Sequence, residues 1–293
     1  MKIKKVIILG IDAIEHDLVE KWNLKNLKQK EYGKTKLPLL PGQEPATVII
    51  WPCFITGKEP DEMGYSSAYI FAKPLKPIIS LITPIARMVF IDTKAEDRAQ
   101  KKHGKQSILN NFTIFFKKIG LIHMPTKDDI KADTIFDNKK IKSIHLHIPV
   151  YDKDDFPEYR KDIVKILSEK IYYPVIEMKQ KKEFRKRSKE VYEYIKKNDW
   201  QLFMQYFYVL DGVQHVFYRN LKKIAEFYLM FDELVKKVSE MIDKETLLLI
   251  VSDHGLKKGI HTKHGFYSIN KKLGLKNPKI IDFKEIIEKK LKS

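Results

Sequence analysis

The chain has 293 residues, of which 43% are hydrophobic and 32% are charged, and its formal net charge is +18 at pH 7. These values exclude an intrinsically disordered chain and a protein with many membrane spans, and the length fits one large α/β domain or a core with a modest cap. The excess of positive charge favours an anionic partner, such as a phosphate-bearing substrate, a nucleic acid or an acidic membrane surface.

The first predicted element is a strand over residues 5–11 (KVIILGI), a continuous apolar run typical of strands buried on both faces of a parallel sheet. It ends at Asp12. Because no small-residue cleavage site precedes Asp12 and Glu15, we interpret this segment as a strand rather than as a signal peptide. The longest apolar stretch, residues 78–91, is interrupted by proline and arginine and is too short for a spanning helix, so we expect a cytoplasmic protein without a transmembrane segment.

Residues 65–140 interrupt the alternation of strands and helices. They contain a proline-punctuated apolar stretch, a polar segment over residues 92–106 and then an aromatic run. We interpret them as a small inserted cap over the C-terminal edge of a sheet, between two parts of a core at residues 1–64 and 141–293.

Residues 141–150 alternate well enough to predict a further strand, on which His145 and His147 share one face. We interpret these two histidines as structural rather than as metal ligands. Helices are predicted from about residue 158 to 171 and from about 181 to 197. The basic run in the second helix is typical of a solvated helix face, with a docking surface for an anionic polymer as the alternative.

Two more strands of the buried type follow, at residues 202–209 and 246–251. Between them, apolar residues recur at steps of three and four over residues 221–242, which predicts an amphipathic helix with one buried stripe. The order strand, helix, strand predicts a crossover between parallel strands, and therefore an α/β fold.

Each of the three buried-type strands delivers an aspartate at its carboxyl end. Asp12 ends the first strand, and Asp211 and Asp253 come just after the other two. Ligands of open parallel sheets bind outside the carboxyl ends of the strands. The three carboxylates are therefore expected to converge on one site.

Four histidines accompany these aspartates. His215 lies one helical turn after the second aspartate, so both side chains can reach one cation, and His254 directly follows the third. His261 and His264 come within ten residues of His254. The single cysteine excludes a thiolate cluster, whereas Asp and His are usual ligands of zinc and manganese, and paired metals of this kind perform phosphoryl transfer. The pattern predicts two divalent ions, Zn or Mn. Taken singly, each aspartate could instead be a helix cap, and each histidine could be structural.

The same residues resemble the alkaline phosphatase superfamily, and within it the type I phosphodiesterase and nucleotide pyrophosphatase family. The shared features are the first strand ending in Asp, a Thr-Gly pair at Thr56 and Gly57, the D-x-x-x-H and S-D-H-G motifs, and a late His. The match covers about residues 3–64 and 141–272. It implies a doubly wound, mostly parallel sheet flanked by helices.

The resemblance also implies a nucleophile and two sets of ligands. The family's nucleophile lies nine residues before the Thr of the Thr-Gly pair, where this chain has Thr47. Ile49 and Ile50 stand where relatives commonly carry Pro and where nucleotide pyrophosphatases carry Asn. One metal would be bound by Asp12, Thr47, Asp253 and His254, and the second by Asp211, His215 and a late histidine, with His261 favoured and His264 as the alternative.

A metal-coordinated threonine hydroxyl has a lowered pKa and can attack phosphorus in line, giving a phospho-threonine that water then hydrolyses. We therefore predict a metal-dependent phosphodiesterase, nucleotide pyrophosphatase or phosphatase, with an anionic phosphate ester as substrate and nucleotides among the candidates. Trp51, Tyr65 and Tyr267 would either stack on a base or ring of the substrate or pack in the core.

There are two alternatives to this function. One is another chemistry of the same superfamily, namely a sulfatase, which needs Cys or Ser at the position of Thr47, or a phosphoglycerate-mutase-like enzyme, which normally uses Ser. The other is a catalytically weak protein that binds nucleic acid or anionic headgroups through its positive charge. No RNA-recognition, KH or helix-turn-helix pattern supports nucleic-acid binding, and metal content separates this class from the enzymes.

Overall fold

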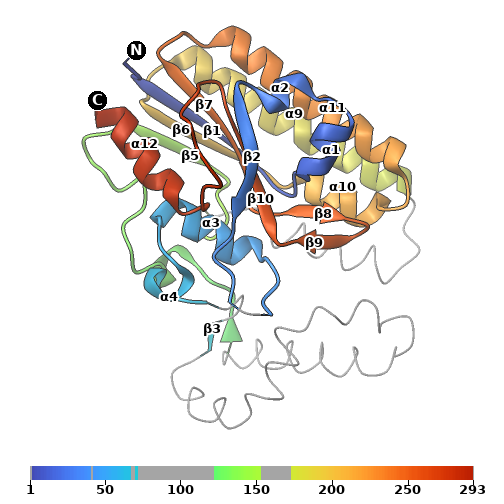
Figure 1. Cartoon of the computed structure of the whole chain (residues 1–293), viewed down its shortest axis with the longest axis horizontal. Coiled ribbons are helices and arrows are strands. Elements are labelled where there is room, and N and C mark those ends of the chain that lie inside the picture. Colours follow the sequence, from blue (N-terminus) through green and yellow to red (C-terminus); the bar gives the residue numbers. More distant parts are fainter. Residues whose placement is uncertain (1, 41, 67–69, 72–121, 153–172, 293) are drawn as a thin grey trace.

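A computed structural model of the chain describes residues 2–40, 42–66, 70–71, 122–152 and 173–292 (Figure 1). The helix predicted from about 158 to 171 and most of the segment interpreted as a cap lie outside these residues. The division into a core and a cap therefore stays a prediction.

A six-stranded sheet forms the centre of the fold (Figure 1). From one edge to the other, the strands are β2 (Glu31–Lys36), β10 (His264–Ile269), β7 (Thr246–Ser252), β1 (Lys5–Ile11), β6 (Leu202–Phe207) and β5 (Ser143–Leu146). β1 is parallel to both of its neighbours and β5 is parallel to β6, whereas β10 is antiparallel to β7 and to β2. The prediction of an α/β fold on a mostly parallel sheet is confirmed.

The side chains of the central strand β1 alternate between two hydrophobic cores, one on each face of the sheet. Val6 and Ile8 lie in the first core, whereas Ile7, Leu9 and Ile11 lie in the second. All five are completely buried. Burial on both faces explains why this strand is continuously apolar in sequence.

Helices cover both faces of the sheet. α3 (Thr47–Thr56) and α12 (Asp282–Lys292) pack in the first core, and α9 (Tyr173–Lys197), α10 (Val209–Phe217) and α11 (Leu221–Met241) pack in the second. Figure 1 shows the two groups on opposite sides of the sheet. α11 agrees with the helix predicted over residues 221–242, and its buried stripe includes Tyr228, Phe231 and Val235.

Shorter elements complete the described part of the chain. They are α1 (His16–Lys21), α2 (Lys25–Lys28), α4 (Pro60–Met63), the strand pair β3 (Ile70–Phe71) and β4 (Ile122–His123), a 3-10 helix (Lys127–Asp129), and the hairpin of β8 (Gly255–Lys257) and β9 (Ile260–Thr262). Among the helices that the structure describes, none is long and apolar enough to cross a membrane.

Two strands end earlier than predicted. Val209 already belongs to α10, which places Asp211 in the first turn of that helix. β5 is only four residues long. His147 follows its end with a φ of 63°, a left-handed conformation that a strand does not accommodate, and Asp152 holds the turn that follows by accepting a backbone N–H.

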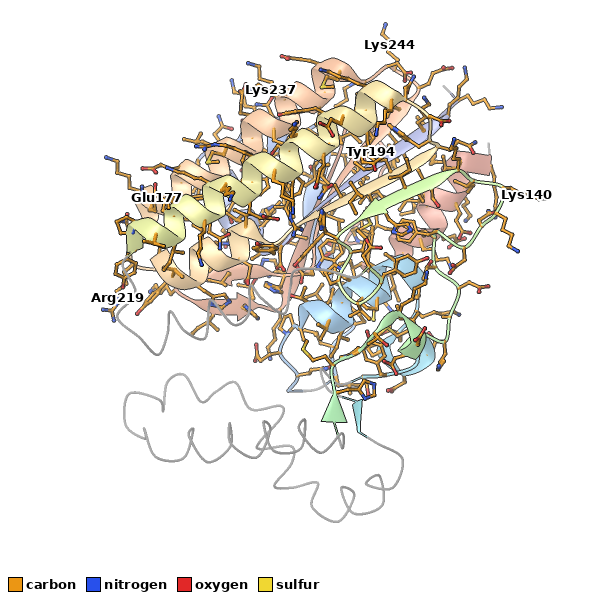
Figure 2. All side chains as sticks on the ribbon, turned by 180° about the vertical axis from the view of Figure 1, so that it is seen from behind. Lys140, Glu177, Tyr194, Arg219, Lys237 and Lys244 are labelled. Carbon is orange, nitrogen blue, oxygen red and sulfur yellow. The ribbon has the colours of Figure 1, made fainter. Side chains whose placement is uncertain are left out.

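α9 contains the basic helix predicted over residues 181–197, and Figure 2 shows it from behind with Glu177 and Tyr194 along it. Most of its basic side chains lie outside the core, but Arg187 is only 1% exposed. Its guanidinium donates to the carboxylate of Glu183 at 2.7 Å and to the carbonyl oxygen of Tyr206 at 2.8 Å. The interpretation of the basic run as a solvated face is therefore wrong for Arg187, because this side chain ties α9 to the end of β6.

Candidate functional site

The three aspartates that sequence singled out lie at the carboxyl ends of three neighbouring strands. Asp12 directly follows β1, Asp253 directly follows β7, and Asp211 lies in the first turn of α10, which begins two residues after β6. Because β1 lies between β7 and β6 in the sheet, the carboxylates meet at one edge. This is the edge at which open parallel sheets bind ligands.

Asp12, Asp253 and His254 form a first cluster, in which one potential ligand atom of each residue lies within 4.8 Å of the others. Nε2 of His254 is 3.3 Å from Oδ1 of Asp12 and 3.5 Å from Oδ2 of Asp253. All three side chains are buried, and neither carboxylate oxygen of Asp253 has a hydrogen-bond partner among the described residues. Burying a charge without a partner is unfavourable, which makes this cluster a candidate cation site.

Asp211, His215 and His261 form a second cluster that meets the same distance criterion. Oδ1 of Asp211 is 3.2 Å from Nε2 of His215, one turn further along α10, and 3.7 Å from Nε2 of His261. The two histidine Nε2 atoms are 3.0 Å apart. His261 lies on β9. Its Nδ1 donates to the carbonyl oxygen of Pro45 at 3.3 Å, so its Nε2 faces the cluster.

The two clusters adjoin each other through their histidines. The rings of His254 and His261 are stacked, with centroids 4.0 Å apart and an angle of 22° between their planes. His261, a member of the second cluster, therefore also contacts His254 of the first cluster. The arrangement offers two neighbouring sets of Asp and His donors.

Thr47 is the first residue of α3, and its Oγ1 donates to Oδ2 of Asp12 at 3.4 Å. α3 holds this position because nine of its ten residues are buried. Trp51, one turn after Thr47, lies directly over β1 at Gly10, where a Cβ atom would come within 2.7 Å of the indole ring. The close approach of helix and strand therefore requires glycine here and fixes the hydroxyl beside Asp12.

The two clusters differ in their electrostatics. Burial, together with the carboxylates of Asp253 and Asp211, raises the pKa of Asp12 well above its ordinary value. Burial lowers the pKa of His254 to about 4, so its imidazole is neutral at pH 7. Burial alone would raise the pKa of Asp211, but the neighbouring charges and hydrogen bonds of His215 and His261 hold it well below the usual range. The first cluster thus combines two acidic side chains with a neutral imidazole, which is the form of histidine that binds metals.

Tyr206 belongs to the candidate site although no sequence pattern pointed to it. Its hydroxyl is completely buried and donates to Oδ2 of Asp12 at 2.5 Å. Burial and the charge of Asp12 raise the pKa of Tyr206 well above its ordinary value, so it stays a donor. A tyrosine inside an apolar strand has the pattern of a core residue, and only the pairing of β6 with β1 brings it to the aspartate.

The remaining candidates lie outside both clusters. His264 is on β10, and its Nε2 is 3.4 Å from Oε1 of Glu15. His145 and His147 face Asp152 and Glu190, at 2.7 and 3.0 Å.

The aromatic residues considered for stacking on a substrate lie in the core. Trp51 is completely buried, and Tyr65 and Tyr267 are 8% and 3% exposed. Of the two possibilities for these side chains, the structure shows core packing.

Comparisons with known proteins place the chain in a family. The profile of the Type I phosphodiesterase / nucleotide pyrophosphatase family matches residues 6–290. A comparison with curated proteins gives no match.

Solved structures are similar to the chain in fold. A variant of the alkaline phosphatase from the Antarctic bacterium TAB5, with Mg bound, has a TM-score of 0.50 at 12% identity over 99% of this chain and 98% of that chain. A protein from Pyrococcus horikoshii has a TM-score of 0.47 at 12% identity over 100% and 98% of the two chains. Phosphonoacetate hydrolase from Sinorhizobium meliloti, in complex with phosphonoformate, has a TM-score of 0.46 at 12% identity, and the match covers 86% of this chain but only 56% of that chain. Because the family profile spans nearly the whole sequence, the resemblance drawn from the motifs is confirmed, and the chain belongs to the Type I phosphodiesterase / nucleotide pyrophosphatase family.

Proposed function

We propose that this protein is a phosphoester hydrolase that uses two divalent metal ions and Thr47 as a covalent nucleophile. Family membership supports the hydrolysis of a phosphate ester. The finer proposal rests on one juxtaposition: the stacked rings of His254 and His261 join the two Asp/His clusters, and Asp12 of the first cluster accepts a hydrogen bond from the hydroxyl of Thr47.

The donor atoms of both clusters fit a divalent cation. Carboxylate oxygen and imidazole nitrogen are the ligand atoms that zinc and manganese accept, and neither carboxyl oxygen of Asp253 has a hydrogen-bond partner in the described part of the chain. The first ion would be held by Asp12, Thr47, Asp253 and His254, and the second by Asp211, His215 and His261. The Mg bound to the TAB5 alkaline phosphatase variant adds magnesium to the ions worth testing.

The chain itself positions the nucleophile and its neighbours. When bound, divalent ions would lower the pKa of a coordinated hydroxyl and offset negative charge on the phosphoryl oxygens. Oγ1 of Thr47 gives its proton to solvent and bonds to phosphorus as the bond between phosphorus and the leaving-group oxygen breaks, and that oxygen takes up a proton from solvent. Water then attacks the phospho-threonine, which restores the threonine hydroxyl and releases the phosphoryl group as a phosphate product. Tyr206 donates to one oxygen of Asp12 and so fixes the orientation of that carboxylate beside Thr47.

A substrate screen of metal-loaded protein tests the proposal. The panel contains aryl phosphate monoesters, aryl phosphodiesters, nucleotides and sulfate esters, each assayed with the loaded protein and after exhaustive EDTA treatment. We expect turnover of at least one class of phosphate ester, its loss with EDTA and its return with Zn or Mn. Turnover that EDTA leaves undiminished, or protein that binds fewer than two ions, would contradict the two-metal mechanism. Protein that binds neither ion and turns over no ester would instead favour a binding protein.

A further inference from the structure

We propose that Glu15 is a positioning residue whose carboxylate holds the β8–β9 hairpin, and with it His261, against the loop that carries Asp12. The proposal rests on the proposed function, because it concerns the residue that completes the second ion site. It also gives His264 a role as the partner of Glu15 rather than as a metal ligand.

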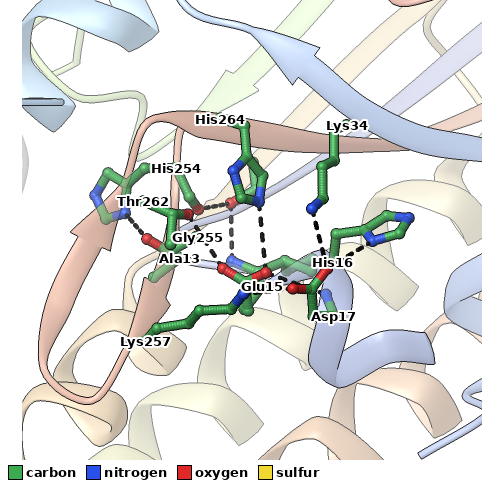
Figure 3. Close-up of polar contacts among 12 residues, drawn as sticks. Ala13, Glu15, His16, Asp17, Lys34, His254, Gly255, Lys257, Thr262 and His264 are labelled. Atoms are coloured by element: carbon green, nitrogen blue, oxygen red, sulfur yellow. Dashed lines mark hydrogen bonds and ion pairs between the residues drawn. The ribbon is translucent and has the colours of Figure 1, made fainter. Parts of the chain in front are cut away.

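Glu15 lies three residues after Asp12 and is completely buried. Figure 3 shows its polar contacts. Its Oε2 accepts a hydrogen bond from Oγ1 of Thr262 at 3.1 Å, and its Oε1 accepts the backbone N–H of Asp17 at 3.1 Å. Nε2 of His264 is 3.4 Å from Oε1. The carboxylate therefore connects the loop after β1 with the last residue of β9 and the first residue of β10.

The backbone of Glu15 is fixed as well as its side chain. Its N–H donates to the hydroxyl of Tyr228, a completely buried residue of α11, at 2.8 Å. The hydrogen bond to α11 thus fixes the backbone of Glu15, so its side chain can act as a rigid support for the hairpin.

The contact explains why glycine ends the S-D-H-G motif. A Cβ atom on Gly255 would lie 2.3 Å from Oε2 of Glu15 and 2.6 Å from Oγ1 of Thr262. Real contacts are never so short, so a larger residue would displace the carboxylate or the hydroxyl. Gly255 is therefore a condition for the contact between Glu15 and the hairpin.

The geometry of the hairpin links the contact at Thr262 to the position of His261 in the second cluster. Gly255 pairs with Thr262 and Leu256 pairs with His261 in the β8–β9 register. Successive side chains of a strand point to opposite faces, so holding Thr262 toward Glu15 directs His261 to the other face, toward Asp211. Glu15 therefore acts on the second cluster without touching any of its members.

A different side chain joins the loops around the first cluster. Oγ of Ser252 accepts the N–H of Ile14 at 2.9 Å and donates to the carbonyl oxygen of His254 at 2.8 Å. This link does not include the hairpin. Loss of Glu15 should therefore weaken the second ion site selectively and leave the first in place.

Metal titration of the apo protein tests this selectivity. Parent, Glu15→Ala and Glu15→Gln proteins are stripped with EDTA and titrated with Zn²⁺ by calorimetry and with Co²⁺ by visible absorption. An Asp211→Ala variant lacks a member of the second cluster, so the binding step that this variant loses belongs to the second site. We expect Glu15→Ala to weaken that step about 10- to 100-fold, the range typical of residues that support metal ligands, with the other step unchanged.

Controls separate positioning from general destabilisation. Asp17→Asn is the matched control, because Asp17 lies two residues after Glu15, in the first turn of α1, and contacts Lys257 of the same hairpin but is partly exposed. We expect both ion affinities to stay at the parent value in this variant. Thr262→Val keeps the side-chain size, removes only the donor to Glu15 and should weaken the second step in the same direction. It provides the test if Glu15→Ala does not fold.

The histidines complete the test. We expect His261→Ala to abolish the second step, and Glu15→Ala combined with His264→Ala to lose no more affinity than Glu15→Ala alone, because paired residues are not additive. Parent affinity for both ions in Glu15→Ala, equal loss of both steps, or a larger loss in His264→Ala than in His261→Ala would overturn the proposal. A parent protein that binds fewer than two ions would overturn the proposed function instead.

Discussion

The hydroxyl of Thr47 stands at the start of a buried helix and beside a buried aspartate, where a covalent nucleophile would be needed. We expect Thr47→Ala to lower turnover by roughly 10³-fold or more, because it removes the residue that forms the intermediate. Thr47→Ser should retain measurable activity, because serine offers the same hydroxyl with one methyl group fewer. Steady-state kinetics on the substrate identified by the screen measures both.

The intermediate itself provides the control for this prediction. Stopping the parent reaction at low pH should leave phosphate on the peptide that contains Thr47, detected by mass spectrometry as an added phosphoryl group. Thr47→Ala should give no such peptide but should keep part of its metal binding. A label on another residue would make that residue the nucleophile, and an active Thr47→Ala protein without any label would make water the direct nucleophile.

At this scale the sequence indicated the residues that follow strands, because an apolar run marks where a strand ends. Asp12 and Asp253 are of this kind. Tyr206 and Glu15 could not be found in the same way. In sequence, Tyr206 resembles an interior residue of a strand, and Glu15 resembles an exposed residue at the start of a helix. Glu15 does cap α1 by accepting the N–H of Asp17, but the sequence does not show that it is buried. Their burial and their partners depend on contacts between segments more than 190 residues apart.

Among the elements, the packing of α3 against β1 determines the position of the proposed nucleophile. Gly10→Ala would bring a Cβ atom to 2.7 Å from the ring of Trp51, which is buried against Phe54 and Tyr206 at ring distances of 5.8 and 5.3 Å. We expect the free energy of unfolding to fall by about 1–3 kcal/mol, as is usual for overpacking, and turnover to fall because α3 shifts. Urea unfolding and steady-state kinetics measure these effects.

A smaller ring at position 51 is the matched control. Trp51→Phe frees space above Gly10, so the double variant Gly10→Ala with Trp51→Phe should be more stable than the sum of the two single effects predicts. Simple additivity of the two changes would mean that the ring does not determine the cost of the added methyl group.

Two strands of the sheet that the sequence did not predict, β2 and β10, lie side by side at one edge. The strands β1, β6 and β7 were recognisable because they are buried and apolar. β2 reads EYGKTK, and only Thr35 is fully buried in it, so its polar sequence has no strand signature. Charged residues are common on edge strands because they discourage pairing with other chains. β10 begins at His264, a residue that the sequence indicates only as a candidate metal ligand, so no strand was predicted there.

For the molecule as a whole, the proposed ions should contribute to stability. Only the folded chain brings the donors of each cluster together, so binding favours the folded state. We expect Zn or Mn at about 100 times its dissociation constant to raise the free energy of unfolding of EDTA-treated protein by about 3 kcal/mol for each site. Thermal unfolding at a series of metal concentrations measures this effect. A double variant, Asp211→Ala with Asp253→Ala, should lose most of the increase, and an equal increase in that variant would indicate metal binding elsewhere.

The position of β1 has a consequence for how the protein is made. Both hydrogen-bonding edges of this strand are completed by β6 and β7, and Val6 pairs with Leu202, roughly 200 residues later in the chain. During synthesis the KVIILGI segment therefore leaves the ribosome long before either partner exists, and its apolar surface needs protection from aggregation in that interval. The donors from residues 12, 211 and 261 likewise meet only when nearly the whole chain is available. A nascent or prematurely terminated chain would carry Thr47 without the proposed metal ligands, so the proposed activity would begin only after these segments have folded together.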